Sequence, residues 1–134
     1  MRKVAALLAA VIVLAAAGPA AAASAPPGIW ANPSDSVRVA FRRCGEAICG
    51  TVIWANAKAE ADARRGGTDR LVGTMLFRDF VEEDAHRWSG EVYIPDIGQS
   101  LSGTITQIDA RTLVGEGCVF AGFGCKSQTW KRLK

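Results

Sequence analysis

The stretch Arg87–Thr106, RWSGEVYIPDIGQSLSGTIT, contains two runs of alternating side chains separated by a turn. In residues 87–94 apolar residues or glycine occupy every second position, and residues 101–106 repeat the pattern with hydroxyl side chains between them. The intervening Pro95-Asp96-Ile97-Gly98 is typical of a turn. A period of two with one apolar face indicates half-buried antiparallel strands, so this stretch predicts a β-hairpin.

The same alternation recurs along the chain and is interrupted by short turn signals. It predicts an all-β fold, a small antiparallel meander of seven or eight strands. Short hairpins with glycines inside the strands indicate a closed barrel or else a sandwich. The predicted strands are residues 28–31, 36–43, 48–55, 71–81, 86–94, 99–108, 112–119 and 126–133.

One segment departs from the strand pattern. Asn56–Arg65 is rich in alanine and holds a Glu60–Arg64 pair four residues apart, which favours a helix. Asn56 is suited to cap its start, and Gly66-Gly67 to end it. We expect one short helix over residues 56–66, either a lid over one barrel mouth or a solvated surface excursion.

The first 23 residues have the order of a secretory signal. Arg2-Lys3 precedes the apolar run Val4–Ala17, and small residues reach Ala23. A spanning helix needs about 20 apolar residues, so an uncleaved anchor is disfavoured. The pattern predicts cleavage after Ala23, a flexible leader over residues 24–27 and one barrel domain over 28–134. We therefore expect a periplasmic or secreted protein with no stable membrane insertion after cleavage.

Length and charge exclude several classes of protein. The chain has 134 residues, and after Ala23 it holds 14 basic and 13 acidic side chains. A small, nearly neutral domain is neither a multidomain enzyme nor a strongly basic nucleic-acid binder. We expect no nucleic-acid partner.

The four cysteines allow three pairings into two disulfides, as expected in an oxidising compartment. Local pairing of Cys44 with Cys49 and of Cys118 with Cys125 is favoured, because each pair encloses a glycine-bearing turn. Each short loop would stabilise the fold by about 2–2.5 kcal/mol. A zinc site is disfavoured, since neither gap is Cys-x-x-Cys and only one histidine is present. No metal or cofactor is predicted.

The residues that could carry catalysis are sparse. His86 is the one histidine, and no Gly-x-Ser-x-Gly motif supports a serine nucleophile. Glu82, Glu83 and Asp84 are consecutive, so a strand would point them to different faces. The sequence predicts no enzyme, and a hydrolase remains a third hypothesis that needs His86 beside an acid and a hydroxyl.

The aromatic side chains suggest an interior. A small barrel either fills its interior with side chains or leaves room for one apolar ligand. Tyr93 and Asp96 flank a turn and are candidate polar contacts at the rim. The residues predicted to line the interior or its rim are Trp54, Met75, Phe77, Trp88, Val92, Tyr93, Leu101, Ile105 and Trp130.

An ordered set of motifs resembles the exported bacterial family called domain of unknown function 2147. The resemblance spans nearly all of Gly28–Arg132 and implies a calycin-like barrel, related in shape to lipocalins, with no established activity. The motifs are Gly28-Ile29-Trp30, Cys44–Gly50 running into Val52-Ile53-Trp54, Leu71-Val72-Gly73, Trp88-Ser89-Gly90, Tyr93–Gly98, Gly117-Cys118 and Ser127–Arg132.

Two features of lipocalins map onto this chain. Gly28 and Trp30 match their opening Gly-x-Trp, and the resemblance implies that Arg132 packs over Trp30 through a cation–π contact. The chain is short for a lipocalin. The segment Asn56–Gly67 lacks the Asn-Pro-Asp run that is usual in the 2147 family. The resulting hypothesis is a binding module for a small apolar or amphipathic ligand. The alternative is a filled barrel that binds an envelope or host protein through its outer surface.

Overall fold

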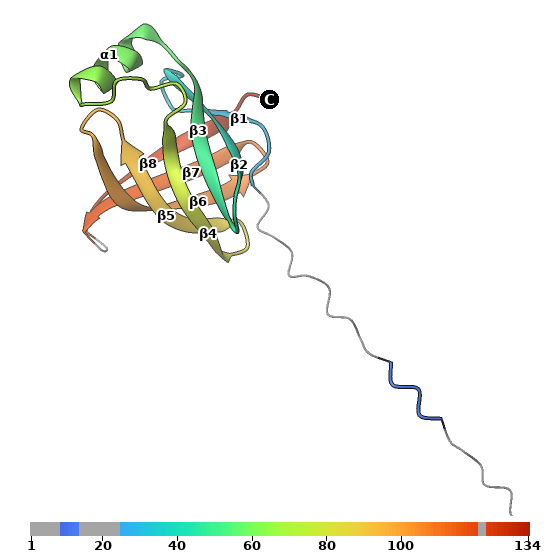
Figure 1. Cartoon of the computed structure of the whole chain (residues 1–134). Helices are drawn as coiled ribbons and strands as arrows, with labels where there is room; N and C mark the ends of the chain where they lie inside the picture. Colours follow the sequence, from blue (N-terminus) through green and yellow to red (C-terminus); the bar gives the residue numbers. More distant parts are fainter. Residues whose placement is uncertain (1–8, 14–24, 121–122) are drawn as a thin grey trace, which may run out of the picture.

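The computed structural model describes residues 9–13, 25–120 and 123–134. These residues form a closed barrel in which each strand pairs antiparallel with the next and β8 pairs with β1 (Figure 1). The predicted all-β barrel with one short helix is therefore confirmed. In chain order the elements are β1 (Ile29–Ala31), β2 (Val37–Cys44), β3 (Ala47–Ala55), α1 (Ala57–Arg65), β4 (Met75–Asp84), β5 (Arg87–Ile94), β6 (Gln99–Asp109), β7 (Thr112–Phe120) and β8 (Phe123–Arg132).

The segment before the barrel is described only in part. Residues 9–13 are exposed and form neither helix nor strand, and the predicted cleavage point after Ala23 lies outside the described residues. No helix in the described part of the chain is long and apolar enough to cross a membrane. Ala25 packs against the core and Pro26 is fully buried, so the described part of the predicted leader contacts the barrel.

Most predicted strand bounds agree with the structure to within two residues, and the fourth strand is the main exception. It begins at Met75, whereas the alternation predicted residue 71. The Thr74 backbone N–H donates to the carbonyl of Leu71 at 3.0 Å, which closes a turn before the strand. Gly73 occupies the left-handed region in this turn, at φ 91°.

Two of the β-bulges between neighbouring strands illustrate how an inserted residue changes which side chains face the interior. In the β2–β3 pair, Arg38 lies opposite Trp54 while Val39 lies opposite Val52, so Ile53 is an extra residue. A bulge in β4 falls between Arg78 and Val81. An inserted residue reverses the alternation beyond it, and the sequence period does not reveal where this happens.

Aromatic rings fill the barrel around Phe77. Its ring centroid lies 5.3 Å from that of Phe41, 5.8 Å from Phe80 and 5.6 Å from Trp130. These separations are within the range in which aromatic pairs attract one another. The buried core as a whole comprises Trp30, Val39, Ile48, Val52, Ala63, Leu71, Leu76, Phe77, Phe80, Trp88, Ile105, Leu113 and Trp130.

A row of glycines on the inner wall makes room for these side chains. Gly90, Gly103 and Gly117 lie opposite one another on β5, β6 and β7. A Cβ on Gly90 would lie 2.8 Å from the Phe80 ring, and one on Gly103 would lie 2.3 Å from Val92 Cγ2. The core therefore packs directly on the backbone of β5 and β6.

We predict that Gly103→Ala destabilises the protein by about 1–3 kcal/mol, because the added methyl also falls 2.8 Å from the Glu116 carbonyl oxygen. The matched variant is Gly115→Ala, whose added Cβ would meet only ordinary contacts at 3.6 Å or more. It should be neutral or stabilising by up to about 1 kcal/mol. Urea unfolding of both variants measures the difference, and equal free energies would contradict this account of packing.

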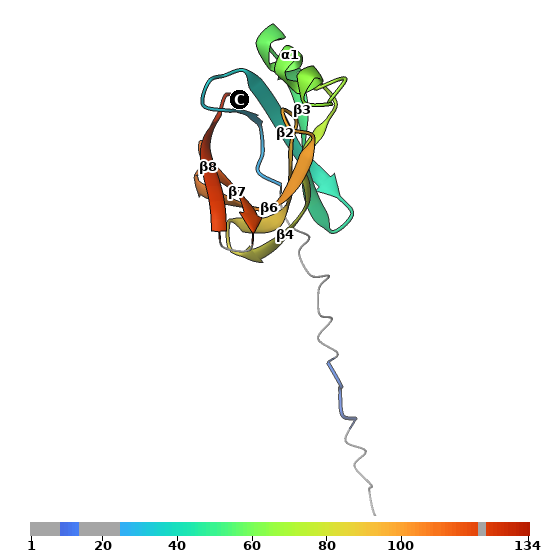
Figure 2. The ribbon, with the colours of Figure 1, turned by 90° about the vertical axis from the view of Figure 1, so that its left-hand side faces the viewer.

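Helix α1 covers one end of the barrel (Figure 2). The Asn56 side chain accepts from the Ala59 N–H at 2.9 Å and caps the helix, as predicted. Ala63 is fully buried in the core. The Glu60 carboxylate accepts the backbone N–H groups of Leu71 and Val72, at 3.2 and 3.4 Å. The helix and the segment after it therefore pack against the core at this end and are not a solvated excursion; we call them the lid segment.

On the outer side of the lid, charged residues pair within the helix. The hydrogen bond from Lys58 Nζ, 2.6 Å long, is the main cause that lowers the pKa of Asp62, and Arg65 also contacts this carboxylate. A lowered carboxyl pKa contributes stability at neutral pH that is lost as the pH falls through it. Because all three side chains are exposed to varying degrees, this contribution is small.

Candidate functional site

Most of the residues predicted to line an interior do come together. Phe77, Trp88, Ile105 and Trp130 are buried in one core, and Val92 packs against it half-buried. Met75 and Leu101 are also half-buried. Phe77, Trp88, Ile105 and Trp130 pack together with Val92, so the part of the interior that they form is filled.

Trp54 does not face the interior, which corrects the prediction. Its side chain is 39% exposed on the outer wall, and the Arg38 guanidinium lies 4.3 Å from the ring centroid. The cause is the bulge at Ile53, which places Trp54 opposite the outward-facing Arg38.

Tyr93 lies on the other face of β5 from Val92, opposite Ser100, and packs half-buried against the edge of the core. The Tyr93 hydroxyl lies 2.6 Å from Thr68 Oγ1, and Arg78 lies 4.5 Å from the ring centroid. Thr68 also donates to the carbonyl of Pro95 at 3.0 Å. Tyr93 therefore fastens the lid segment to the β5–β6 turn, where Asp96 is exposed.

The inner wall is not covered everywhere. Leu113, Gly115 and Gly117 of β7 lie opposite Trp130, Gln128 and Lys126 of β8. Buried Leu113 and Trp130 fix this as the inward set, yet Gln128 and Lys126 are exposed, and Val119, next in the set, is 58% exposed. We call this uncovered part of the inner wall the open-end face; its residues are Leu101, Gly115, Gly117, Val119, Lys126 and Gln128.

The open-end face has room beside an apolar floor. A Cβ on Gly117 would find Leu101 Cδ1 at 3.8 Å, and one on Gly115 would find Phe77 at 3.6 Å and Trp130 Nε1 at 3.7 Å. These distances are ordinary contacts, unlike the overlaps at Gly90 and Gly103. The Trp130 indole N–H therefore lies next to the face. Within the described residues the Lys126 ammonium makes no ion pair.

Sequence reasoning missed the open-end face except for Leu101 and neighbouring Trp130. A signal was present: the inward set that ends in Trp130 passes through Gln128 and Lys126, two polar residues where a filled core would need apolar ones.

Two adjoining hollows of about 420 Å³ each lie on the outer wall, over β4 to β7. They share Gly90 and Ser102, and their linings are rich in hydroxyl and carboxylate groups. Within the lining, Ser89 donates to Glu83 at 2.5 Å, and Arg78 pairs with Glu91 at 3.8 Å. Several of these polar groups therefore already pair with one another.

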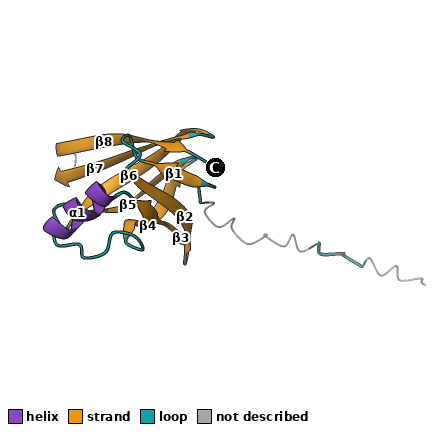
Figure 3. Cartoon of the chain, turned by 90° about the horizontal axis from the view of Figure 1, so that it is seen from above, coloured by secondary structure: helices purple, strands orange, loops and turns teal. Residues whose placement is uncertain are grey.

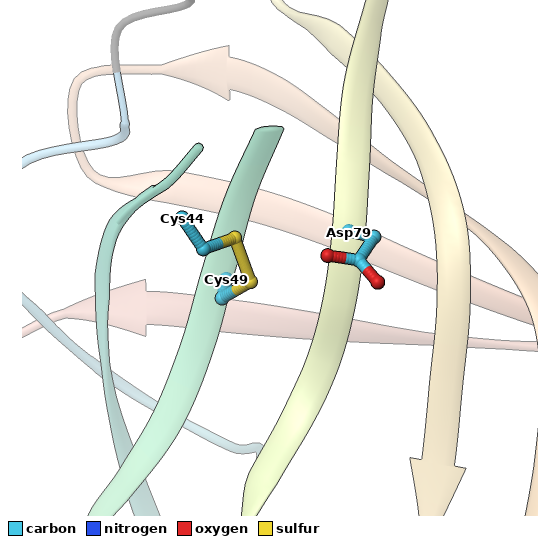
Figure 4. Close-up of side chains that lie close together, drawn as sticks. All are labelled: Cys44, Cys49 and Asp79. Atoms are coloured by element: carbon cyan, nitrogen blue, oxygen red, sulfur yellow. A yellow bond between two sulfur atoms is a disulfide. The ribbon is translucent and has the colours of Figure 1, made fainter. Parts of the chain in front are cut away.

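Both disulfides form with the favoured local pairing, Cys44–Cys49 and Cys118–Cys125. Each has a carboxylate beside it: Asp79 lies near the first (Figure 4) and Glu116 near the second. Each group therefore brings two sulfurs and one carboxylate within 4.8 Å. A cysteine binds metal as a thiolate, so the sulfurs of a disulfide are not available as such ligands. Asp79 adopts φ 51° at the β4 bulge.

His86 lies in the β4–β5 turn at φ 65° and is exposed. Its carbonyl accepts the Gln107 N–H at 2.8 Å, which is a backbone role. Among the described residues its ring makes no hydrogen bond to an acid or a hydroxyl, so the arrangement that the hydrolase hypothesis requires of His86 is not formed.

The residues predicted to close the barrel are adjacent. Trp30 on β1 lies directly opposite Arg132 on β8, and Trp30 is fully buried. The cation–π contacts of the described residues involve other pairs, Arg38 with Trp54 and Arg78 with Tyr93. The implied stacking of Arg132 on Trp30 is therefore absent from the described part of the structure, although the strand pairing is present.

The closed barrel of eight antiparallel strands is a lipocalin-like fold. Its fold is similar to that of protein HP1028 from the human pathogen Helicobacter pylori, described as belonging to the lipocalin family. The two structures superpose with a TM-score of 0.64 and 16% sequence identity, over 84% of this chain and 85% of that one.

The chain belongs to the family described as uncharacterized protein conserved in bacteria, DUF2147, which matches residues 28–132. No curated protein matches the chain. The predicted family resemblance is therefore confirmed.

Proposed function

We propose that this protein is an exported binding module for a small amphipathic ligand, which lies against the open-end face. The observation that carries the proposal is the exposure of inward-facing side chains beside buried Phe77 and Trp130. In a filled barrel these positions would be apolar and covered. Here these positions are uncovered and partly polar, as in a site where a bound ligand covers them.

The chemistry of the face supports an amphipathic ligand with an acidic group. Leu101, Val119 and the two glycines offer an apolar surface. The Trp130 indole N–H is a donor, and Lys126 at the rim is a cation suited to a carboxylate. The filled core beneath Phe77 leaves no depth for a large ligand, so we infer a short chain or a single ring system.

Export is supported by the two disulfides, because such bonds persist in oxidising compartments. The order of charged, apolar and small residues in positions 1–23 supports the same inference.

We expect Gly117→Leu to weaken binding of a short fatty acid at least about tenfold, because its side chain would occupy the space beside Leu101. The matched control is Glu116→Leu, which adds leucine on the outer face of the same strand and should leave affinity unchanged. Titration followed by tryptophan fluorescence measures both, since Trp130 borders the face. Binding that is absent across a panel of amphipathic acids, or that survives Gly117→Leu, would contradict the proposal.

A second candidate function is binding of an envelope or host protein through the outer wall. Ile53 and Trp54 favour it, because the bulge exposes these consecutive apolar side chains by 43% and 39%. The two functions are separable, since Trp54→Ala should be silent in the ligand titration and should weaken only the outer contact.

A further inference from the structure

Strand β8 pairs with β7 along one edge and with the shorter strand β1 along the other. β1 contacts β8 only at Trp30 with Arg132 and at Ala31 with Lys131. Beyond Ala31 the chain turns away into β2, and the Asn32 N–H donates to the Val37 carbonyl at 3.1 Å. Residues 125–129 of β8 therefore continue past the end of β1. Figure 3 shows β8 at the border of the barrel, extending well beyond β1.

The backbone of this segment presents unpaired groups at the border. Arg132 donates its N–H toward β7, to the Arg111 carbonyl, whereas Leu133 donates toward β1, to Ile29. Successive residues of a strand direct their backbone groups to opposite edges. Cys125, Ser127 and Thr129 share the direction of Leu133, and within the described residues their N–H and carbonyl groups have no backbone partner.

Little protects this edge. The side chains from Gly124 to Thr129 are all exposed, no proline interrupts them, and no register shift occurs in the β7–β8 pair. The Cys118–Cys125 disulfide holds the segment to β7, so the edge is preformed. An exposed, regular edge of this kind is a template for another strand.

We propose that the edge pairs with the same edge of a second copy, antiparallel, with Ser127 on the two-fold axis. Ser127 then lies opposite Ser127 of the partner subunit, and Cys125 opposite Thr129 of the partner subunit. Each of these residues donates one N–H and accepts one. The two barrels share a continuous sheet across the axis.

Side-chain complementarity selects a second copy as the occupant. In this register Lys126 lies opposite Gln128 of the partner subunit on the same face, and the symmetric contact repeats it. The Lys126 ammonium, the one charged group of residues 125–129, can donate to the amide oxygen of Gln128 of the partner subunit. It does not lie opposite Lys126 of the partner subunit, so the two charges do not repel each other directly. Net charge after Ala23 is +1, so long-range repulsion between copies is weak.

A charge swap tests the register. Gln128→Lys sets two lysines opposite each other and should raise the dimer dissociation constant about tenfold. The double variant Lys126→Glu with Gln128→Lys sets Glu opposite Lys and should restore dimerisation. Sedimentation of the oxidised protein up to about 1 mM measures each, because an edge this short gives a weak interface.

Cross-linking provides an independent readout. Ser127→Cys places two thiols on residues whose Cα atoms would be about 5.5 Å apart, within disulfide range, and should give a covalent dimer on mild oxidation. The control Thr104→Cys, on the outer wall of β6, should stay monomeric. A wild-type protein that remains monomeric at the highest concentration, or a dimer indifferent to the charge swap and to Ser127→Cys, would overturn the proposal. The ligand titration keeps Lys126 and Gln128 as they are and is done at low protein concentration, where the monomer prevails, so the two outcomes are distinguishable.

Discussion

Replacing Phe77 by alanine should remove about 3–5 kcal/mol of folding free energy, a large part of the total for a domain of this size. Phe77 is 5% exposed, and its ring contacts three other aromatic rings. Because those rings come from β2, β4 and β8, none can move inward to fill the cavity without disturbing its own strand. Urea unfolding at 25 °C, compared with the wild type, measures the loss.

Two controls separate packing from strand propensity. Phe77→Leu keeps an apolar side chain of moderate size and should cost about 1–1.5 kcal/mol. Val81→Ala, on the same strand but 55% exposed, should change stability by no more than about 0.5 kcal/mol. A Phe77→Ala loss as small as that of Val81→Ala would show that the ring is not the centre of the core.

Trp30→Ala should be similarly severe, at about 3–5 kcal/mol, because the side chain is fully buried where β1 joins β8. The informative comparison is Trp30→Phe. The indole Nε1 of Trp30 is buried without a hydrogen-bond partner among the described residues. An unpaired buried donor costs about 1–3 kcal/mol, so its removal offsets part of the lost ring volume.

We therefore expect Trp30→Phe to cost less than half of what Trp30→Ala costs, measured by the same unfolding assay. Trp88→Phe is the matched control, because the Trp88 indole nitrogen is also buried and unpartnered. If both phenylalanine variants lost as much folding free energy as Trp30→Ala, the indole N–H groups would have to be hydrogen-bonded, which would contradict this prediction.

The sequence predicted the fold well because local alternation and turn chemistry agree with the final barrel. The hairpin over residues 87–106 is the clearest example, since its strands and its turn were each readable from adjacent residues. The disulfides followed for the same reason, because each joins the two arms of one hairpin.

Two sequence predictions are wrong, the direction of Trp54 and the start of the fourth strand, because an irregularity interrupts the alternation at each place. Trp54 shares parity with Val52, which predicts that it faces inward, and only the inserted Ile53 reverses its direction. A bulge depends on what the facing strand does, which the local pattern does not contain. The alternation also predicts that the fourth strand begins at residue 71 and not at Met75, because Leu71 and Gly73 continue it through a turn.

The open-end face and the free edge depend on the length of one strand. β1 has three residues, and Pro33 soon after it, which cannot donate a ladder hydrogen bond, is the sequence feature that prevents a longer strand. Its effect appears far away in the chain, along residues 125–129, where the polar Lys126 and Gln128 are a local sign of the open-end face but not of the free edge.

The seam between β1 and β8 has a kinetic consequence. The Ile29 N–H donates to the Lys134 carbonyl at 2.9 Å, and Leu133 donates back to Ile29 at 2.8 Å. These partners are separated by more than a hundred positions, so the seam forms only after the ribosome has added Lys134. Until then Trp30 lacks its neighbour on β8 and the barrel of the nascent polypeptide stays open. A chaperone can still bind the chain in this incompletely folded state.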